Sequence, residues 1–428
     1  MNNKLRRVAF FVRAYNDLDH LTPLVAEFIL KKENPLIVVY TDLDVDNDYR
    51  FIYLKSLGNF EIIKEMDMEY VEFSKKRGFF HNLFKKFYLL KRNRKKFIGK
   101  IYRKLFFNCA KQIEFLKSNN IGICAFEWST PYSRGELVEK YFFAAKGIGI
   151  TTIALPHGCN LFFYPDSNSG YKWTTQKGVI PDESDRNLFD YYIFQNPIRR
   201  DHCIKWGQDP IKTQAWGSCR FYPEWSIKNK EICPKFNYKE KSGKKLKVVF
   251  MQFQKNYNLK NDLAFDTLKK LSNLENILLT VKDSTREGKE YYDRNKKTNS
   301  LGKSLVGWYG NDIHSPALIE WADIVIVVGG SSIGVEVILQ EKTLIHPIYL
   351  DTNTTLYEYF QAAHCPNSYE ELEQLLNSQV KGNNLPKLEG TESLLKEIIY
   401  AGKEEFNVPK KYYDELKKIN LNYGQIIK

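Results

Sequence analysis

The sequence lacks paired cysteines, long hydrophobic runs and internal repeats, and each absence excludes a class of protein. Its 7 cysteines are scattered with no CxxC pair, which argues against a disulfide framework or a zinc site and indicates reduced thiols in a cytosolic setting. No run approaches the roughly 18 to 20 apolar residues that cross a bilayer. The opening MNNKLRRVAFFVRAYND is typical of a first strand rather than a signal peptide, because Arg13 interrupts its apolar run. We expect a soluble or peripheral protein that is not a repeat array.

What the sequence has in excess is positive charge, and the whole excess lies in one segment. The net charge is +13, and residues 75–107 hold 13 lysines and arginines but no aspartate or glutamate. The other 51 basic residues are balanced by 51 acidic ones. The segment therefore predicts a local basic surface rather than a generally basic protein.

The rest of the chain alternates short apolar runs with helical patterns, which predicts βα units and parallel sheets. A chain of 428 residues exceeds the usual size of one core, so we expect two domains of about 150 to 200 residues. The pattern lapses at residues 225–245, which we interpret as the linker. An N-terminal domain (1–224) would contain the basic insertion 75–107, and a C-terminal domain (246–393) would be followed by a helical tail (394–428). The predicted fold class is α/β, with two doubly wound, Rossmann-like sheets facing a cleft.

The stretch ADIVIVVGGSSIGVEV contains the most informative turn of the sequence. Its β-branched run, Ile324–Val328, predicts a strand buried on both faces of a parallel sheet. Gly329 and Gly330 then permit a sharp turn that a side chain would obstruct, and Ser331 or Ser332 is placed to cap the following helix. The sequence therefore predicts a strand that enters a helix through a bare backbone.

Such a turn suits an anionic ligand. The first amide groups of a helix have no partner within it, and the helix dipole puts partial positive charge at the same place. Glu336 would lie about one helical turn further on, within reach of the same ligand. The alternative is an ordinary βα connection with a solvated Glu336. The stretch fits neither the P-loop nor the GxGxxG dinucleotide pattern.

Three elements together resemble the GT-B glycosyltransferases, in particular the bacterial enzymes of surface polysaccharide and teichoic acid assembly. GGSSIGVEVILQEKTLIHPIYL resembles their donor-side element, IALPHG (153–158) is similar to their His-Gly element, and AWGSCRFY resembles the Gly-Ser-x-Arg-Tyr/Phe element before their linker. The resemblance implies a GT-B fold with an acceptor-side N-terminal domain and a nucleotide-donor C-terminal domain. It also implies sugar transfer from a nucleotide-sugar co-substrate with no other cofactor and without a bound metal.

The stretch LLTVKDSTREG departs from one branch of that family. Glycerophosphate-transferring relatives carry Lys-Pro-His-Pro at this place, and Lys282 matches the lysine. Asp283 and Ser284 stand at the first Pro and His positions, which puts phosphoglycerol chemistry in doubt. Lys282 and Arg286 would instead stabilise the leaving nucleotide, although ordinary surface cations are the alternative interpretation.

Two residues are candidates for the base that activates the acceptor hydroxyl. His157 follows a predicted strand and precedes Gly158, so its ring would face the cleft, and neutral imidazole has a suitable pKa. Glu127, at the end of the strand one βα unit earlier, is the second candidate. A lone His or Glu at a strand end also often serves only for packing or capping. His346 and His314 are expected near the donor's base or ribose. The candidate donor-binding residues are Gly329, Gly330, Ser331, Ser332, Glu336, Lys282, Arg286 and His346.

One feature points to a different fold. VVYTDLDVDND places Asp42, Asp44, Asp46 and Asp48 after a predicted strand, and GT-A glycosyltransferases hold a divalent metal with Asp-x-Asp in this position. The alternative, which we prefer, is an acidic loop that caps the next helix, because a metal site here would leave the Gly-Gly-Ser-Ser turn unexplained. We therefore expect no metal.

The basic segment admits three interpretations: a nucleic-acid surface, a solvated helical face, or a membrane-binding element. We favour the third, because aromatic residues at helical spacing beside basic flanks predict short amphipathic helices that bind anionic membranes. The candidate membrane-binding residues are Phe80, Phe84, Phe87, Lys91, Arg92, Arg94, Lys95 and Lys96.

The sequence thus predicts a metal-independent glycosyltransferase, cytoplasmic and peripheral on the inner face of the plasma membrane. It would move a sugar from a nucleotide-sugar donor to a surface polysaccharide or lipid-linked glycan. The alternatives on the same fold are a polyol-phosphate transferase, with a CDP-glycerol-like donor, and a nucleotide-sugar 2-epimerase. Outside that class stands a non-catalytic nucleic-acid-binding protein, which we do not expect.

Overall fold

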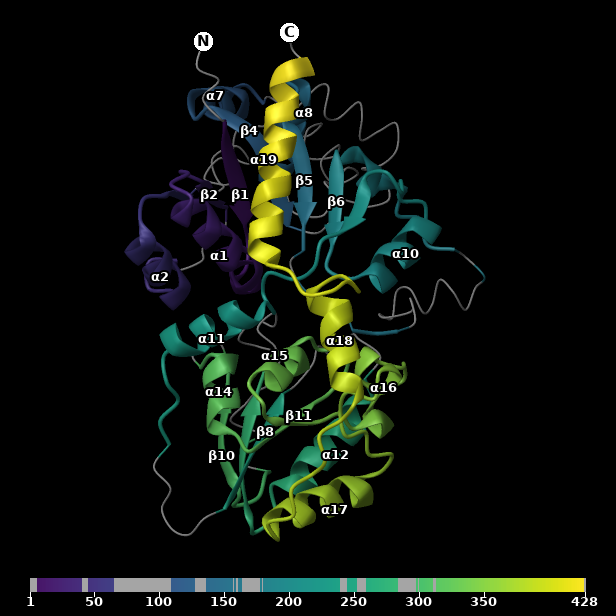
Figure 1. Ribbon diagram of the computed structural model, residues 1–428. Coiled ribbons are helices and arrows are strands. Elements are labelled where there is room, and N and C mark those ends of the chain that lie inside the picture. Colours follow the sequence, from purple (N-terminus) through teal and green to yellow (C-terminus); the bar gives the residue numbers. More distant parts are fainter. Residues whose placement is uncertain are drawn as a thin grey trace, which may run out of the picture.

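The protein contains two parallel β-sheets, each covered by helices, as the predicted α/β class requires (Figure 1). The computed structural model describes residues 6–40, 45–64, 109–127, 136–156, 158, 161–163, 178, 180–238, 245–251, 259–283, 298, 300–310 and 313–426. The basic segment 75–107 and its candidate membrane-binding residues lie outside these ranges. No helix in the described part of the chain is long and apolar enough to cross a membrane.

The first sheet has 7 strands in the order β3-β2-β1-β4-β5-β6-β7. Every neighbouring pair is parallel. The strands are β1 (Arg7–Val12), β2 (Leu36–Val39), β3 (Glu61–Lys64), β4 (Ile121–Glu127), β5 (Thr151–Leu155), β6 (Tyr191–Phe194) and β7 (Thr213–Ala215). The order reverses between β1 and β4, and open parallel sheets bind ligands at the carboxyl ends of strands at such a switch point.

The second sheet has 5 parallel strands in the order β10-β9-β8-β11-β12. They are β8 (Leu246–Met251), β9 (Ile277–Lys282), β10 (Leu305–Tyr309), β11 (Ile324–Val327) and β12 (Thr343–Ile345). Here the order reverses between β8 and β11. The Gly-Gly-Ser-Ser turn, which follows β11, therefore lies at the switch point of this sheet.

The buried strands explain why these segments are extended. In β11 all residues are buried, and the run is β-branched, which suits a strand covered by helices on both faces. One apolar cluster includes residues of both sheets, such as Phe10 and Ile123 of the first and Val325 and Met251 of the second. The two halves are therefore packed on each other.

Helices cover both sheets. Those of the first half are α1 (Tyr15–Leu30), α2 (Tyr49–Leu57), α7 (Ala110–Ser118), α8 (Glu136–Gly147) and α10 (Pro197–Lys205), with the short η1 (Ser184–Leu188). Those that follow are α11 (Pro223–Ile232), α12 (Asn261–Leu271), α14 (Ser315–Trp321), α15 (Ile333–Leu339), α16 (Leu356–Tyr359), α17 (Tyr369–Val380), α18 (Gly390–Ile399) and α19 (Val408–Ile426), with η2 (Ile348–Leu350).

Helix α11 occupies the first part of the span that we interpreted as the linker, residues 225–245. Pro223 stands at the start of the helix, where its missing N–H costs nothing. The helix contacts α2 of the first half and α14 and α15 of the second. The division of the chain into folding units at residues 224 and 246 stays a prediction.

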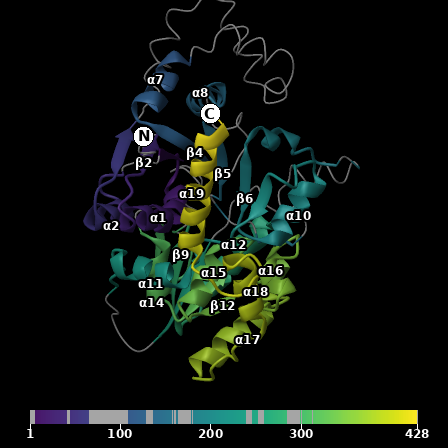
Figure 2. The same ribbon diagram turned by 45° about the horizontal axis from the view of Figure 1, so that its top comes forward.

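The end of the described chain returns to the first sheet, as both views show (Figures 1 and 2). Helix α19 packs against α1, where the rings of Phe28 and Tyr413 meet edge to face at 4.9 Å. The Tyr412 hydroxyl donates to Gly217 O over 2.8 Å, and the Asn420 amide donates to Arg6 O over 2.6 Å. The helical tail thus completes the covering of the first sheet.

Candidate functional site

At the switch point of the first sheet, a cation and a carboxylate lie side by side. Arg13 follows β1 directly, and Glu127 is the last residue of β4. Arg13 Nε is 2.9 Å from Glu127 Oε1, and the carboxylate is buried. The Tyr40 hydroxyl lies 3.5 Å from the same oxygen. Glu127, one of the two candidate bases, is therefore held in place by an arginine. His157, the other candidate, lies outside the described residues.

The Gly-Gly-Ser-Ser turn has the backbone that its sequence predicted. Gly329 has φ +67°, a conformation that favours glycine, and its amide donates to Asp351 Oδ1 over 3.1 Å. Ser332 stands at the N-cap of α15, but neither its hydroxyl nor that of Ser331 makes the predicted capping bond. Instead the Ser331 carbonyl accepts a 2.6 Å hydrogen bond from the Tyr357 hydroxyl. Hydrogen bonds from the backbone of the turn to the side chains of Asp351 and Tyr357, not a serine cap, fix this turn.

His346 supports the Gly-Gly-Ser-Ser turn through contacts with Val327 and Asp351. It is fully buried, with Nδ1 at 2.8 Å from Val327 O and Nε2 at 3.1 Å from Asp351 Oδ2. Asp351 in turn accepts from the Gly329 amide. In this structure the ring contacts the strand end and Asp351, which makes it a support of the donor-side turn.

A segment from the first half lies across the turn. Leu161 donates its amide to Gly330 O over 3.4 Å, and Phe162 pairs with Thr355 in an isolated bridge. A Cβ placed on Gly330 would stand 2.8 Å from the ring of Phe162. Residues 161–162, which follow the IALPHG element in the sequence, thus contact the donor-side element.

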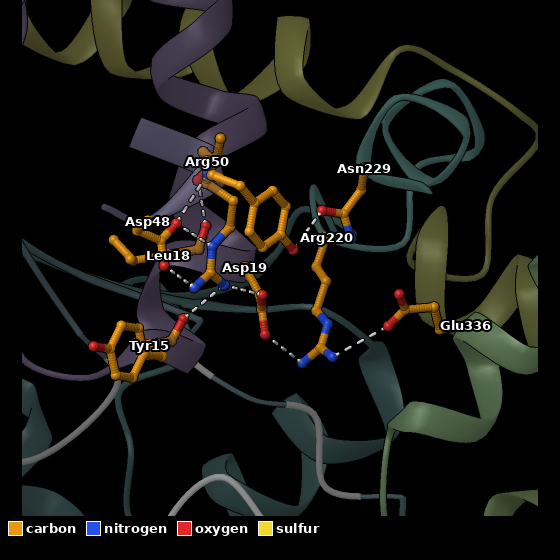
Figure 3. Close-up of polar contacts among 10 residues, drawn as sticks. Tyr15, Leu18, Asp19, Asp48, Arg50, Arg220, Asn229 and Glu336 are labelled. Carbon is orange, nitrogen blue, oxygen red and sulfur yellow. Dashed lines mark hydrogen bonds and ion pairs between the residues drawn. The ribbon is translucent and has the colours of Figure 1, made fainter. Parts of the chain in front are cut away.

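Between the two sheets, five charged side chains form an ionic chain: Asp48, Arg50, Asp19, Arg220 and Glu336 (Figure 3). Asp48, Arg50 and Glu336 are buried, whereas Asp19 and Arg220 are partly buried. Asp19 comes from α1 and Arg50 from α2, while Arg220 lies in the turn after β7 and Glu336 in α15. Arg220 Nη1 is 3.4 Å from Asp19 Oδ2, and its Nη2 is 3.4 Å from Glu336 Oε2. The ionic chain therefore joins elements of both halves.

Burial and ion pairing shift the pKa values of the groups in the ionic chain in opposite directions. Burial raises the pKa of Glu336 to about 7, against the smaller opposing effect of Arg220. Burial also acts to raise the pKa of Asp48, but the hydrogen bonds and charge of Arg50 outweigh it and lower that pKa. For Arg50, burial acts to lower the pKa of the guanidinium, but Asp19, Tyr49 and Asp48 together outweigh it and raise that pKa. Among the carboxyl groups of the ionic chain, that of Glu336 titrates near neutral pH.

His314, expected near the donor, caps α14 beside the ionic chain. Its ring lies 4.8 Å from that of Tyr49, whose hydroxyl donates to Asn229 Oδ1 over 2.9 Å. Burial and the charge of Arg50 lower the pKa of His314, so the ring is a neutral group at physiological pH. It adds a polar, uncharged surface to this junction.

The structure therefore brings together only part of the predicted site. Glu336 is buried and ion-paired rather than solvated, which overturns the alternative interpretation of this residue. Lys282, at the end of β9, is buried, and its Nζ donates to Asp283 O over 3.0 Å. Arg286 lies outside the described residues. The sequence did not single out Asp19, Arg50 or Arg220 as site residues.

The acidic loop after β2 has a structural role in its described part. Asp48 caps α2 by accepting from the Arg50 amide, as the preferred interpretation expected. Asp46 pairs with Lys64 on the surface. Asp42 and Asp44 lie outside the described residues. Within the described ranges, no group of three or more His, Cys, Asp or Glu residues is placed to hold a metal ion.

Comparison with solved structures identifies the fold. S. aureus MnaA, solved with UDP, matches with TM-score 0.56 and 11% identity, over 98% of each chain. A glycosyltransferase from Rickettsia africae ESF-5 matches with TM-score 0.54 and 14% identity, over 98% of this chain and 99% of the other. UDP-N-acetylglucosamine 2-epimerase from Rickettsia bellii matches with TM-score 0.51 and 14% identity, over 99% and 98%. Neither a family model nor a curated protein sequence matches. The chain thus has the fold that these glycosyltransferases and epimerases share.

Proposed function

We propose that this protein is an enzyme that binds a nucleotide-sugar between its two sheets and transfers the sugar to a glycan or lipid-linked acceptor. The observation that carries the proposal is the ionic chain, which joins the two halves where the Gly329–Ser332 turn meets the first sheet. A partly buried arginine and a turn with bare backbone are suited to a leaving group that carries phosphate.

Each part of the site has a role in such a transfer. A base, Glu127 or His157, takes the proton of the acceptor hydroxyl as its oxygen bonds to the anomeric carbon. The bond from that carbon to the phosphate oxygen breaks, and the nucleoside diphosphate leaves with the electron pair. Backbone amides of the turn and nearby cations, including Lys282, stabilise the negative charge that develops on it. Because these groups supply positive charge, the reaction is proposed to need no metal.

UDP is the first nucleotide to test, because one similar structure was solved with it and others are named as UDP-sugar enzymes. The same names favour a second candidate, a nucleotide-sugar 2-epimerase. The two reactions differ in their products. Transfer releases the nucleoside diphosphate, whereas epimerisation leaves the nucleotide-sugar intact with an inverted carbon 2.

A thermal-shift panel of UDP, GDP, CMP, CDP and nicotinamide nucleotides tests the binding step. We expect one pyrimidine or purine nucleotide to raise the Tm progressively, with the logarithm of its concentration above the Kd, since a ligand that binds only the folded state stabilises it. Incubation with the matching nucleotide-sugar, followed by NMR of the sugar, then separates transfer from epimerisation. A CDP-glycerol arm tests the polyol-phosphate alternative. If no nucleotide raises the Tm, the proposed function is wrong.

We further propose that residues 75–107 hold the enzyme on anionic membranes, where a lipid-linked acceptor is found. The support is the sequence: all of the net positive charge and an aromatic stripe lie in this segment. Each basic residue near such a surface contributes about 1 kcal/mol of attraction. Nucleic acid is the competing ligand for the same charges.

A further inference from the structure

The two arginines of the ionic chain are held in different ways. Arg50 grips Asp48 with Nε and Nη2 at 2.9 and 2.6 Å, while its Nη1 donates to Tyr15 O at 3.0 Å and also to Asp19. Among the described residues, the guanidinium of Arg220 has two contacts to carboxylates, both of 3.4 Å, and it lies 5.0 Å from the centre of the Phe221 ring. Charge-assisted hydrogen bonds are usually about 2.7 to 2.9 Å long. Arg50 is therefore a fixed structural cation, and Arg220 is loosely paired.

Arg220 is also the arginine that faces the donor-side turn. Its partner Glu336 lies in the first turn of α15, immediately after Gly329–Ser332. A helical turn spans about 5.4 Å, so a guanidinium at Glu336 is within side-chain reach of an anion held by this turn. Arg50, in contrast, points its donors at α1 and the start of α2 (Figure 3).

The charge balance of the ionic chain leaves a carboxylate in excess. Its three acids, Asp19, Asp48 and Glu336, face two guanidinium groups. The charge of Asp19 acts to raise the pKa of Glu336, and the more distant charge of Arg50 acts to lower it. Tyr49 of α2 and Cys233 after α11, which also interact with Glu336, are neutral when protonated. Removing a cation from a buried carboxylate favours its protonated form. Arg220 therefore has the larger of the two cationic effects that favour ionised Glu336.

We propose that Arg220 exchanges its contact with Glu336 for the phosphate of the bound nucleotide, and that Glu336 takes up a proton as the guanidinium leaves it. The proposal rests on the proposed function in that the anion is taken to be a nucleoside diphosphate. Arg220 then binds the leaving nucleotide as a cation. Glu336 is a positioning residue whose protonation couples the release of Arg220 to pH.

The proton is the direct readout. The pKa of Glu336 in the free protein is about 7, so the carboxyl is already protonated at low pH and ionised at high pH. Binding should therefore take up almost no proton at pH 5.5, about half a proton at pH 7 and nearly one at pH 8. The affinity should fall by up to about tenfold from pH 6 to pH 8 in consequence.

Isothermal titration calorimetry of the full chain in two buffers with different ionisation enthalpies measures this uptake. The probes are UDP and inorganic pyrophosphate, whose own titration cancels when the parent is compared with Glu336→Gln. We expect Glu336→Gln to bind both probes without proton uptake by the protein and without the extra pH dependence. Glu404→Gln, an exposed glutamate, is the matched control and should behave as the parent.

The arginine is tested in the same way. Arg220→Gln should weaken both probes by about 10- to 100-fold, the usual value of a hydrogen bond to a charged group, and Arg220→Lys by less. Arg200→Gln, which removes an arginine from the surface of α10, should have no effect. If Arg220→Gln does not fold, Arg220→Lys and the proton measurement on the parent still decide the matter.

The outcomes separate this inference from the proposed function. Proton uptake that disappears in Glu336→Gln supports the exchange. UDP binding with no uptake at any pH, or with full affinity in Arg220→Gln, overturns the exchange and leaves the proposed function standing. Pyrophosphate binding with the expected uptake, but no binding of any nucleotide, supports the exchange and overturns the proposed donor. If neither probe nor any nucleotide binds, both proposals are wrong.

Discussion

The ring of Phe162 lies against the backbone of Gly330, so close that a Cβ on this glycine would stand 2.8 Å from Phe162 Cδ2. The contact joins the segment after β5 to the turn after β11, across the two halves. The glycine therefore cannot carry a side chain while Phe162 keeps its place. The position of the Phe162 ring in turn depends on the conformation of the turn.

Gly330→Val should abolish nucleotide binding, because a branched side chain blocks the approach of a phosphate to the backbone and displaces Phe162. Adding Phe162→Ala makes room for the valine, so the double variant should regain the parent's Tm without regaining nucleotide binding. Gly147→Val is the control, since an added Cβ there meets nothing within 4 Å. Parent-like nucleotide affinity in Gly330→Val would show that the donor binds elsewhere.

Arg50→Met should destabilise the fold by about 3 to 5 kcal/mol, because buried Asp48 would lose its cation and Asp19 would keep only Arg220 among its described partners. Arg7→Met removes the more exposed pair with Glu61, and we expect a loss of at most about 1 kcal/mol. Urea unfolding of both variants measures the difference. Equal losses would mean that the ionic chain is no more important to stability than a surface pair.

The stability of the fold should depend on pH through Glu336. Its pKa is about 7 in the folded protein and 4.5 ordinarily, so the folded state binds a proton that the unfolded state releases. The resulting stabilisation, on the order of 3 kcal/mol, is complete below pH 4.5 and is lost as the pH rises through 7. Urea midpoints from pH 5 to 8 should therefore fall for the parent relative to Glu336→Gln. Parallel curves for the two proteins would contradict the shift.

Transfer should proceed in excess EDTA, because cations and backbone amides of the protein are proposed to stabilise the leaving nucleotide. The assay is product formation with and without the chelator, on the parent and on Asp44→Ala. Strict dependence on Mn²⁺ or Mg²⁺ that disappears in Asp44→Ala would instead assign the acidic loop a metal and a catalytic role.

The protein should float with vesicles only when they contain anionic lipid. Salt should weaken this binding, since exposed charges are screened over about 8 Å at physiological ionic strength. Replacing Phe80, Phe84 and Phe87 by Ser should weaken it further, because apolar burial contributes about 25 cal/mol per Å². Filter binding with RNA and DNA on the same variants is the comparison. Tight nucleic-acid binding without flotation would reject the membrane proposal.

The sequence predicted the parts of the fold that depend on local patterns. The β-branched run beginning at Ile324 predicted β11, and the two glycines after it predicted a sharp turn, in which Gly329 has a positive φ. Alternation of strands and helices predicted two parallel sheets, and the comparison with solved structures confirms that architecture. These features are encoded within about ten neighbouring residues, so a single sequence suffices to read them.

The partners of the site residues could not be read in the same way. Arg220 belongs to an element that the sequence made visible, but Glu336 is 116 residues away, and only the packing of the two halves brings them together. The same packing buries Glu336. On an exposed face of a helix, its carboxylate would have been solvated. The serine cap at Ser332 was wrong for a related reason: Tyr357 and Asp351, both distant in sequence, hold the turn instead.

Because α19 packs on the first sheet, that sheet can be completed only late in the synthesis of the protein. Phe28 of α1 and strand β4 are complete once the first half has left the ribosome, yet the helix that packs on them, residues 408–426, has still to be synthesised. At about 5 to 20 residues per second, the roughly 200 intervening residues take about 10 to 40 s. During that interval the nascent first sheet has an uncovered apolar flank, the kind of surface that chaperones bind, until α19 packs on it.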